Sequence, residues 1–243
     1  MRKTSIYLLG SGIKGALHFT VETVQALRAC RRVLVLHADP GVIESVREHC
    51  SNVEDLAPLY DGQTIRGDVY HQISHRLVEA ALDSAPVAFL VQGHPLFLVS
   101  ATEYTLDLAE RHNLRVSVLP GVSSFDTLLC DLRIDYGYGV QIFDTTTLLK
   151  AGWKPNSQVP LLLFQLASTL NRAVISGDPE REALRPLIEL LTPLYGADHS
   201  VQVVWSSAHV LESSSITEVT LGDLATAELE LWRRPTLYVP AKD

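Results

Sequence analysis

Short apolar runs alternate with amphipathic stretches along the first half of the chain. The apolar runs with the length of buried strands are residues 4–10, 31–37, 86–95 and 115–121. The stretches with apolar positions at helical spacing are residues 20–30 (with Thr20 a candidate N-cap), 41–50, 68–83 and 100–113. This order predicts a parallel sheet with helices on both faces and active-site loops at the carboxyl ends of its strands.

The second half places more strands in succession. The predicted strands are residues 140–144, 159–167, 200–207, 214–224 and 235–241. Helical patterns cover residues 123–135 and residues 181–196, where Pro186 marks either a helix start or a kink. This order predicts a mixed sheet. We therefore expect two α/β domains, residues 1–120 and 121–243, with a boundary near Gly121 and a ligand site in the cleft between them.

Composition limits the classes of function. The chain has 243 residues and is 47% hydrophobic, yet no run approaches the about 20 apolar residues of a membrane span. The first apolar run is broken by Gly10 and Gly12, which disfavours a signal peptide. Its three cysteines lack metal or redox spacing, as in reduced cytoplasmic proteins. A net charge of −8 disfavours a general nucleic-acid binder.

The segment GSGIKG, residues 10–15, matches the glycine pattern of dinucleotide sites, and Asp39 follows the next predicted strand. In such sites a helix begins at the loop and receives the pyrophosphate on its N-terminus. Here ALHFT intervenes, and the best helix start is Thr20. A nicotinamide or flavin site is therefore disfavoured. A plain turn at a strand end and a loop that floors a cleft for another ligand both remain open.

Three histidines are candidate metal ligands. His71 and His75 stand at i and i+4, a spacing compatible with a metal, but no third ligand is evident. An exposed helix face is the favoured interpretation. For His94, a hydrogen-bonding role in a loop is favoured over a base or metal ligand. We expect no metal site.

The segment LYDGQTIRGDVY, residues 59–70, holds two phenols and a guanidinium. If it is helical from Thr64, Arg66 and Tyr70 share a face. Tyr60 can fold back towards them over an Asp-Gly turn. Each residue also has a structural alternative.

In those alternatives, Tyr60 anchors a loop and Tyr70 packs in the core. Arg66 pairs at the surface with Asp61 or Glu54.

Three motifs carry a resemblance to a known family. They are LLGSGIKG (residues 8–15), VQGHPLFL (91–98) and LPGVSS (119–124), followed by FQLA (164–167) and RPTLYVPA (234–241). In this order they resemble the tetrapyrrole methylase family, the class III S-adenosylmethionine-dependent methyltransferases, over essentially the whole chain. The resemblance implies S-adenosylmethionine bound between two α/β domains, with S-adenosylhomocysteine as product.

On the family pattern, the cofactor site would comprise Gly10, Gln92, Gly93, His94, Phe97, Ser123, Gln165, Leu166 and Thr236. Glycine permits a close approach to a ligand, and the proline of GHP rigidifies the turn. Leu96 and Gln92 depart from the family, which more often has a small residue and an aspartate or aromatic at these positions.

Within the family, the 59–70 segment is similar to that of borosin-type methyltransferases, which methylate backbone amide nitrogens of peptides. Tyr60, Arg66 and Tyr70 match their pattern residue by residue. An amide nitrogen attacks a methyl sulfonium well only as its proton leaves, with negative charge gathering on the oxygen. The resemblance therefore implies Tyr70 as base, Arg66 as partner of the oxyanion and Tyr60 as supporting donor.

The resemblance also implies partners. Fused borosin enzymes continue into a C-terminal peptide substrate, whereas this chain ends at TLYVPAKD, where the catalytic fold would end. We therefore expect a separate precursor peptide as substrate and a homodimer in the cytoplasm. Two alternatives remain open: a methyltransferase for a tetrapyrrole or other small molecule, and a non-catalytic relative that binds a ligand.

Overall fold

The computed structural model describes residues 3–60, 64–173 and 179–242. The chain divides into two compact units, one of Met1–Thr127 with Ala208–Val210 and one of Leu128–Ser207 with Leu211–Asp243. Each unit is described by itself. The domain boundary near Gly121 stays a prediction.

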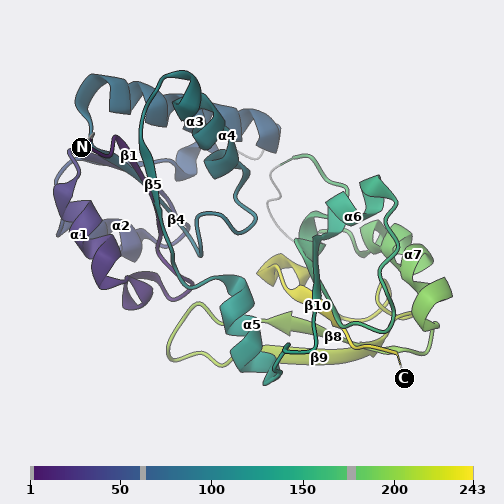
Figure 1. Cartoon of the computed structure of the whole chain (residues 1–243). Coiled ribbons are helices and arrows are strands. Elements are labelled where there is room, and N and C mark those ends of the chain that lie inside the picture. Colours follow the sequence, from purple (N-terminus) through teal and green to yellow (C-terminus); the bar gives the residue numbers. More distant parts are fainter. Residues whose placement is uncertain (1–2, 61–63, 174–178, 243) are drawn as a thin grey trace. The chain divides into compact units, whose positions relative to one another are not determined.

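The first unit is built on a parallel sheet, as predicted (Figure 1). Its five strands lie in the order β3-β2-β4-β1-β5. They are β1 (Ile6–Gly10), β2 (Arg32–Leu36), β3 (Val53–Asp55), β4 (Val87–Val91) and β5 (Val116–Leu119). Gly10 of β1 and Leu36 of β2 both pair with Val91 of β4, so these carboxyl ends lie at one edge of the sheet.

Helices connect these strands. They are α1 (Val21–Ala29), α2 (Pro40–Arg47), α3 (Arg66–Ser84) and α4 (Ser100–Arg111). The predicted cap of α1 is confirmed, because the Thr20 hydroxyl accepts a hydrogen bond from the Thr23 backbone N–H at 3.0 Å. Asp39 caps α2 in the same way, accepting from the Gly41 N–H at 2.8 Å.

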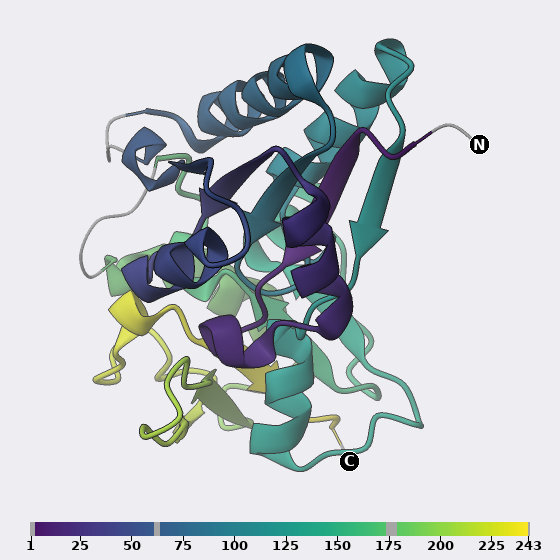
Figure 2. The same cartoon turned by 90° about the vertical axis from the view of Figure 1, so that its left-hand side faces the viewer.

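Both faces of this sheet are covered, because successive strand residues point to opposite sides (Figure 2). Leu8 and Phe89 pack with α3 and α4 in one core cluster. Their neighbours Leu9 and Leu90 pack with α1 and α2 in another. All four strand side chains are fully buried. The predicted arrangement of helices on both faces is therefore confirmed.

The second unit contains the predicted mixed sheet, in the order β6-β7-β10-β8-β9. Its strands are β6 (Gln141–Asp144), β7 (Leu161–Phe164), β8 (Ser200–Trp205), β9 (Ser215–Thr220) and β10 (Thr236–Val239). β6 and β7 are parallel, whereas β10 is antiparallel to both of its neighbours, β7 and β8.

The helices of the second half are α5 (Ser124–Leu132), α6 (Thr145–Ala151) and α7 (Arg185–Tyr195). Pro186 lies in the first turn of α7, so it starts the helix, where a missing N–H costs little. Leu187 and Leu191 of α7 pack on Leu163 and Leu237 of the sheet. α6 is an element that the hydrophobic pattern did not predict.

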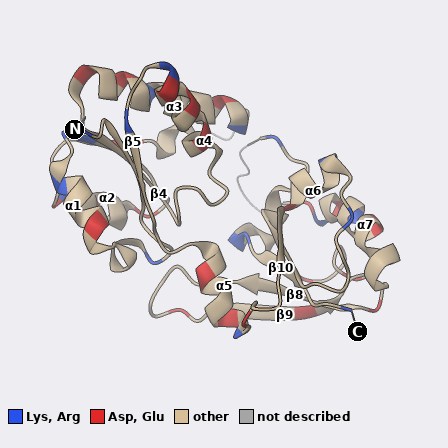
Figure 3. Cartoon of the chain, in the orientation of Figure 1, with Lys and Arg blue, Asp and Glu red and all other residues tan. Residues whose placement is uncertain are grey.

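Acidic and basic residues both occur on helices of the two units (Figure 3). Acidic residues outnumber basic ones over the whole chain, which gives it a net charge of −8. Within the described ranges, no helix combines the length and apolar character needed to cross a membrane.

Candidate active site

Three glycines from three loops meet at the carboxyl edge of the parallel sheet. Gly10 ends β1, Gly93 follows β4 and Gly121 follows β5. A Cβ on Gly10 would lie 2.2 Å from the Gly93 carbonyl oxygen and 3.0 Å from the Gly121 Cα. A Cβ on Gly121 would lie 2.8 Å from the same oxygen. These loops therefore touch through bare backbone, and a side chain at Gly10 would force them apart.

The first glycine loop is closed by its own contacts. Gly12 and Gly93 exchange backbone hydrogen bonds of 3.2 and 2.9 Å, and both have positive φ angles of 73° and 79°. The His18 Nδ1 accepts from the backbone N–H groups of Ile13 and Lys14. A 3-10 helix, Gly15–His18, separates this loop from α1. The interpretation against a dinucleotide site is thus supported, because the loop leads into a four-residue 3-10 helix and not into the N-terminus of an α-helix.

The loop after β4 is held by His94. Its Nδ1 accepts a hydrogen bond from the Leu96 N–H, and its carbonyl accepts one from the Phe97 N–H, each 3.0 Å long. This is the hydrogen-bonding role predicted for His94. The Phe97 ring lies 6.5 Å from that of Phe125, centroid to centroid. Gln92 is exposed at the start of this loop.

Ser123 and Asp126 form a reciprocal cap at the start of α5. The Ser123 hydroxyl accepts from the Asp126 N–H at 3.2 Å, and the Asp126 carboxylate accepts from the Ser123 N–H at 2.6 Å. The same carboxylate accepts from the Ser123 hydroxyl at 2.7 Å. The side chain predicted to bind cofactor therefore also fixes the helix that follows β5.

Replacing Ser123 by alanine is expected to lower the free energy of unfolding by about 1 kcal/mol, since it removes this cap. Urea denaturation followed by circular dichroism measures the change. Ser124→Ala is the matched control: Ser124 is the first residue of α5 rather than its cap. A loss in the control as large as in Ser123→Ala would contradict the capping role.

The structure brings the two predicted phenols together. The rings of Tyr60 and Tyr70 lie 6.4 Å apart, centroid to centroid, with planes inclined by 54°. Both are half-buried against the core under α3 and α4. Arg66 is the half-buried first residue of α3, so it stands one helical turn before Tyr70. The predicted Asp61-Gly62 turn lies outside the described residues.

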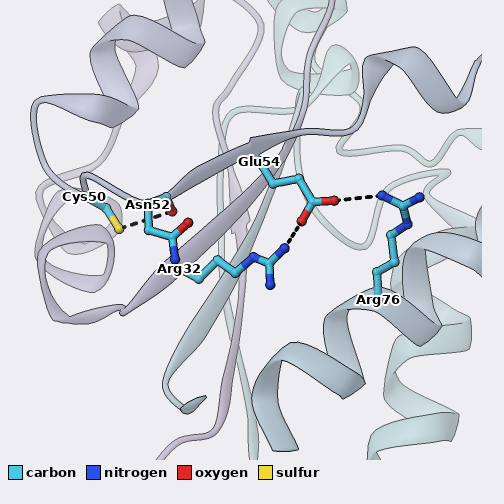
Figure 4. A network of polar contacts seen from close by, with 5 residues as sticks. All are labelled: Arg32, Cys50, Asn52, Glu54 and Arg76. Atoms are coloured by element: carbon cyan, nitrogen blue, oxygen red, sulfur yellow. Dashed lines mark hydrogen bonds and ion pairs between the residues drawn. The ribbon is translucent and has the colours of Figure 1, made fainter. Parts of the chain in front are cut away.

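Glu54, one alternative partner predicted for Arg66, is engaged by two other arginines (Figure 4). Its carboxylate lies 2.5 Å from the Arg32 guanidinium and 2.8 Å from that of Arg76. These ion pairs tie the edge strand β3 to β2 and α3. Both carboxylate oxygens of Glu54 thus have partners other than Arg66.

The first turns of α3 and α4 lie side by side. His71 of α3 stacks on Tyr104 of α4, with ring centroids 4.1 Å apart and planes 13° from parallel. His71 and His75 are exposed, as predicted for a helix face. Over the part of the chain that is described, no group of three or more histidine, cysteine or acidic side chains is arranged to hold a metal.

The remaining predicted cofactor residues lie in the second unit. Gln165 follows β7 with a left-handed backbone, φ 60° and ψ 32°, which is uncommon for a residue other than glycine. Leu166 and Thr236 are buried. Because Leu237 pairs with Leu163, Thr236 at the start of β10 lies at the same end of the sheet as Gln165. The structure thus groups these three residues at one sheet edge.

His37 is a residue of the carboxyl edge that the sequence analysis missed. It follows β2, which pairs with β4, and its side chain is buried. Its Nδ1 accepts from the Asp39 N–H at 3.0 Å, and its Nε2 has no hydrogen-bond partner among the described residues. Burial lowers the pKa of His37, against the opposing effect of Asp39. In the sequence, the feature that could have identified His37 is its position as a polar residue at the end of an apolar strand.

A protein-family model matches the part of the chain that contains these loops. The model of the Tetrapyrrole (Corrin/Porphyrin) Methylases matches residues 5–225. The chain belongs to this family. The resemblance drawn from the loop motifs is therefore confirmed.

Two relatives of this methylase align with nearly the whole chain. The chain is 27% identical over 241 residues to the methyltransferase/ribosomally synthesized type II borosin cyclic peptide precursor of Phlebiopsis gigantea. It is 28% identical over 241 residues to the methyltransferase/ribosomally synthesized type I borosin cyclic peptide precursor of Coprinopsis marcescibilis. Each alignment covers 97% of this chain, but 43% and 61% of the respective relative. The chain therefore spans less than two thirds of their length.

A solved structure shares the fold. The uroporphyrin-III C-methyl transferase from Thermus thermophilus, complexed with S-adenyl homocysteine, matches with a TM-score of 0.63 at 17% identity. The match covers 97% of this chain and 91% of that one. The predicted α/β fold of tetrapyrrole methylase type is thereby confirmed.

Proposed function

We propose that this methylase uses S-adenosylmethionine to methylate backbone amide nitrogens of a precursor peptide, supplied as a separate chain. The observation that carries the proposal is the pair of phenols, Tyr60 and Tyr70, 6.4 Å apart with Arg66 one turn away. The methyltransferase and borosin peptide precursor named in its relatives support it. Catalysis at an amide needs both a base and a partner for negative charge, and this group of side chains offers both.

The cofactor would be held at the carboxyl edge of the parallel sheet. The close backbone contact of Gly10, Gly93 and Gly121 fixes the position of the loop that carries Gln92, His94 and Phe97. Gln92 and Phe97 would contact the cofactor beside His94 and the Ser123 cap. On the family pattern, Gln165, Leu166 and Thr236 are further proposed cofactor residues. When bound, S-adenosylmethionine supplies an electrophilic methyl group.

The protein's own side chains would accept the amide proton and stabilise the negative charge on the amide oxygen. As the amide nitrogen gains the methyl group, its proton passes to Tyr70, which acts as the general base. The negative charge that gathers on the amide oxygen is stabilised by the Arg66 guanidinium, which is always charged and presents several fixed donors. Tyr60 donates a second hydrogen bond to this oxygen or orients the peptide.

Co-expression with candidate precursor peptides, taken from short reading frames adjacent to the gene, tests the proposal. The expected result is a gain in peptide mass in steps of one methyl group. Tandem mass spectrometry should place the methyl groups on backbone nitrogens. An unmodified peptide, together with binding of S-adenosylmethionine in calorimetry, would contradict the proposal.

That result would favour the second candidate, methylation of a tetrapyrrole or other small molecule. The shared fold with a uroporphyrin-III C-methyl transferase supports this alternative. A homodimer and a cytoplasmic location stay predictions; light scattering of the purified protein tests the first.

A further inference from the structure

Several exposed aliphatic side chains lie in segments that follow strands of the parallel sheet. Among described residues 3–127, the exposed large hydrophobic side chains are Leu17, Val21, Ile65, Leu82, Leu96 and Leu98. All except Leu82 lie in segments that follow the carboxyl end of a strand. Exposed apolar side chains that are grouped in one region, rather than scattered singly, indicate a binding surface.

Three of these side chains lie just before α3 and α4, the helices that share a core cluster with Tyr60 and Tyr70. Ile65 immediately precedes Arg66 and is 53% exposed. Leu96 and Leu98, 54% and 40% exposed, precede α4. We name Ile65, Leu96 and Leu98 the aliphatic rim. His71 stacks on Tyr104 near the N-termini of α3 and α4, so the segments that precede the two helices lead into neighbouring helix ends.

The loop that carries Leu96 and Leu98 is held in a defined conformation. Leu98 has a φ angle of 59°, a left-handed conformation that costs a leucine about 1 kcal/mol or more. His94 binds the backbone N–H groups of Leu96 and Phe97, and the Phe97 ring lies beside Phe125. The loop thus keeps Leu96 and Leu98 exposed at a backbone conformation that most residues avoid.

We infer that the aliphatic rim determines specificity: it contacts the side chain of the peptide residue whose amide is methylated and selects an aliphatic one. The inference rests on the proposed function. If Arg66 binds the oxygen of the reacting amide, the side chain next to that amide lies within reach of the adjacent Ile65. Contact would bury apolar surface on both partners. Asp68, exposed in the same turn of α3, disfavours an acidic side chain there.

Leucine and asparagine have nearly the same shape, and asparagine tolerates a left-handed backbone, so Leu96→Asn and Leu98→Asn change polarity with little strain. The probe is the co-expressed precursor peptide, purified in two versions with Leu or Asn at its first methylated position. The measurement is kcat/KM for each version. Leu82→Asn is the matched control, because Leu82 is also 54% exposed but lies at the far end of α3.

The unaltered protein should prefer the Leu peptide by about 10-fold or more. The double variant Leu96→Asn/Leu98→Asn should lose most of this preference, while Leu82→Asn should keep it. An unchanged preference in the double variant, with methylation intact, overturns the inference and leaves the proposed function standing. If the unaltered protein methylates neither peptide, the proposed function fails and the inference fails with it.

The variant Leu98→Gly tests the role of the Leu98 side chain without the risk that the substitution destabilises the fold. Glycine relieves the strain at φ 59° and removes the side chain, so this variant should be at least as resistant to urea as the unaltered protein. It should also prefer the Leu peptide less. A stable Leu98→Gly variant with full preference would argue against a role for Leu98.

Discussion

Replacing Arg66 by alanine is expected to lower the rate of methyl transfer to the peptide by about 10²- to 10³-fold, the loss typical when one donor to a developing oxyanion is removed. The reason is that the amide oxygen would carry its charge without a cationic partner. Arg66→Lys should recover only part of the rate, because an ammonium lacks the planar fork of donors. Single-turnover mass spectrometry of the precursor peptide measures both. Calorimetry should find S-adenosylmethionine binding unchanged.

Arg76→Ala is the matched control for Arg66→Ala. Both arginines lie on α3, but Arg76 is exposed and pairs with Glu54. An exposed ion pair is worth about 0–1 kcal/mol, so this variant should fold and methylate the peptide normally. Tyr60→Phe combined with Tyr70→Phe should also lose turnover. Full activity in that double variant, or equal losses in the two arginine variants, would contradict the proposed roles.

Much of the first unit could be predicted because its local signals agree with its packing. Strands β1, β2 and β4 are apolar on both faces, as helix-covered strands must be, and Thr20 is a cap that can be recognised from sequence alone. The edge strand β3 escaped prediction. It has three residues, of which Asp55 is exposed and Glu54 is charged, so it shows no apolar run.

α6 escaped prediction for a different reason. It follows β6 without a loop, and it opens on three threonines, whose helix propensity is low. Asp144 is both the last residue of β6 and the cap of α6, accepting a hydrogen bond from the Thr147 N–H at 2.7 Å. Thr145 donates its hydroxyl to the Phe164 carbonyl, 2.7 Å away on β7. Such a contact between distant segments stabilises the helix and is invisible to a local pattern.

The candidate site was predictable as a set of residues but not as a geometry. The 59–70 segment indicated that Arg66 and Tyr70 share a helix face, and the structure places both in the first turns of α3. The approach of the Tyr60 ring depends on how the chain turns before α3, which spacing alone does not determine. His37 carries no motif, so its burial at the end of β2 had to come from the fold.

Replacing Gly10 by alanine is expected to lower the free energy of unfolding by about 3 kcal/mol, at the upper end for an overpacked core position. The new methyl group would lie 2.2 Å from the Gly93 carbonyl oxygen, a distance that only a backbone shift can relieve. That shift would also break the hydrogen bonds between Gly12 and Gly93 and displace the loop that begins with Gln92. Urea denaturation measures the stability, and calorimetry should show weakened binding of S-adenosylmethionine.

The opposite result is expected for the same substitution at Gly67. A Cβ there meets no atom within 4 Å, and the residue lies in the first turn of α3. Gly67→Ala should therefore raise the free energy of unfolding by about 0.4–1 kcal/mol, because alanine has less conformational freedom to lose on folding. A Gly10→Ala variant as stable as Gly67→Ala would show that the loops after β1 and β4 can separate freely. Their backbone contact would then not be what shapes the proposed cofactor site.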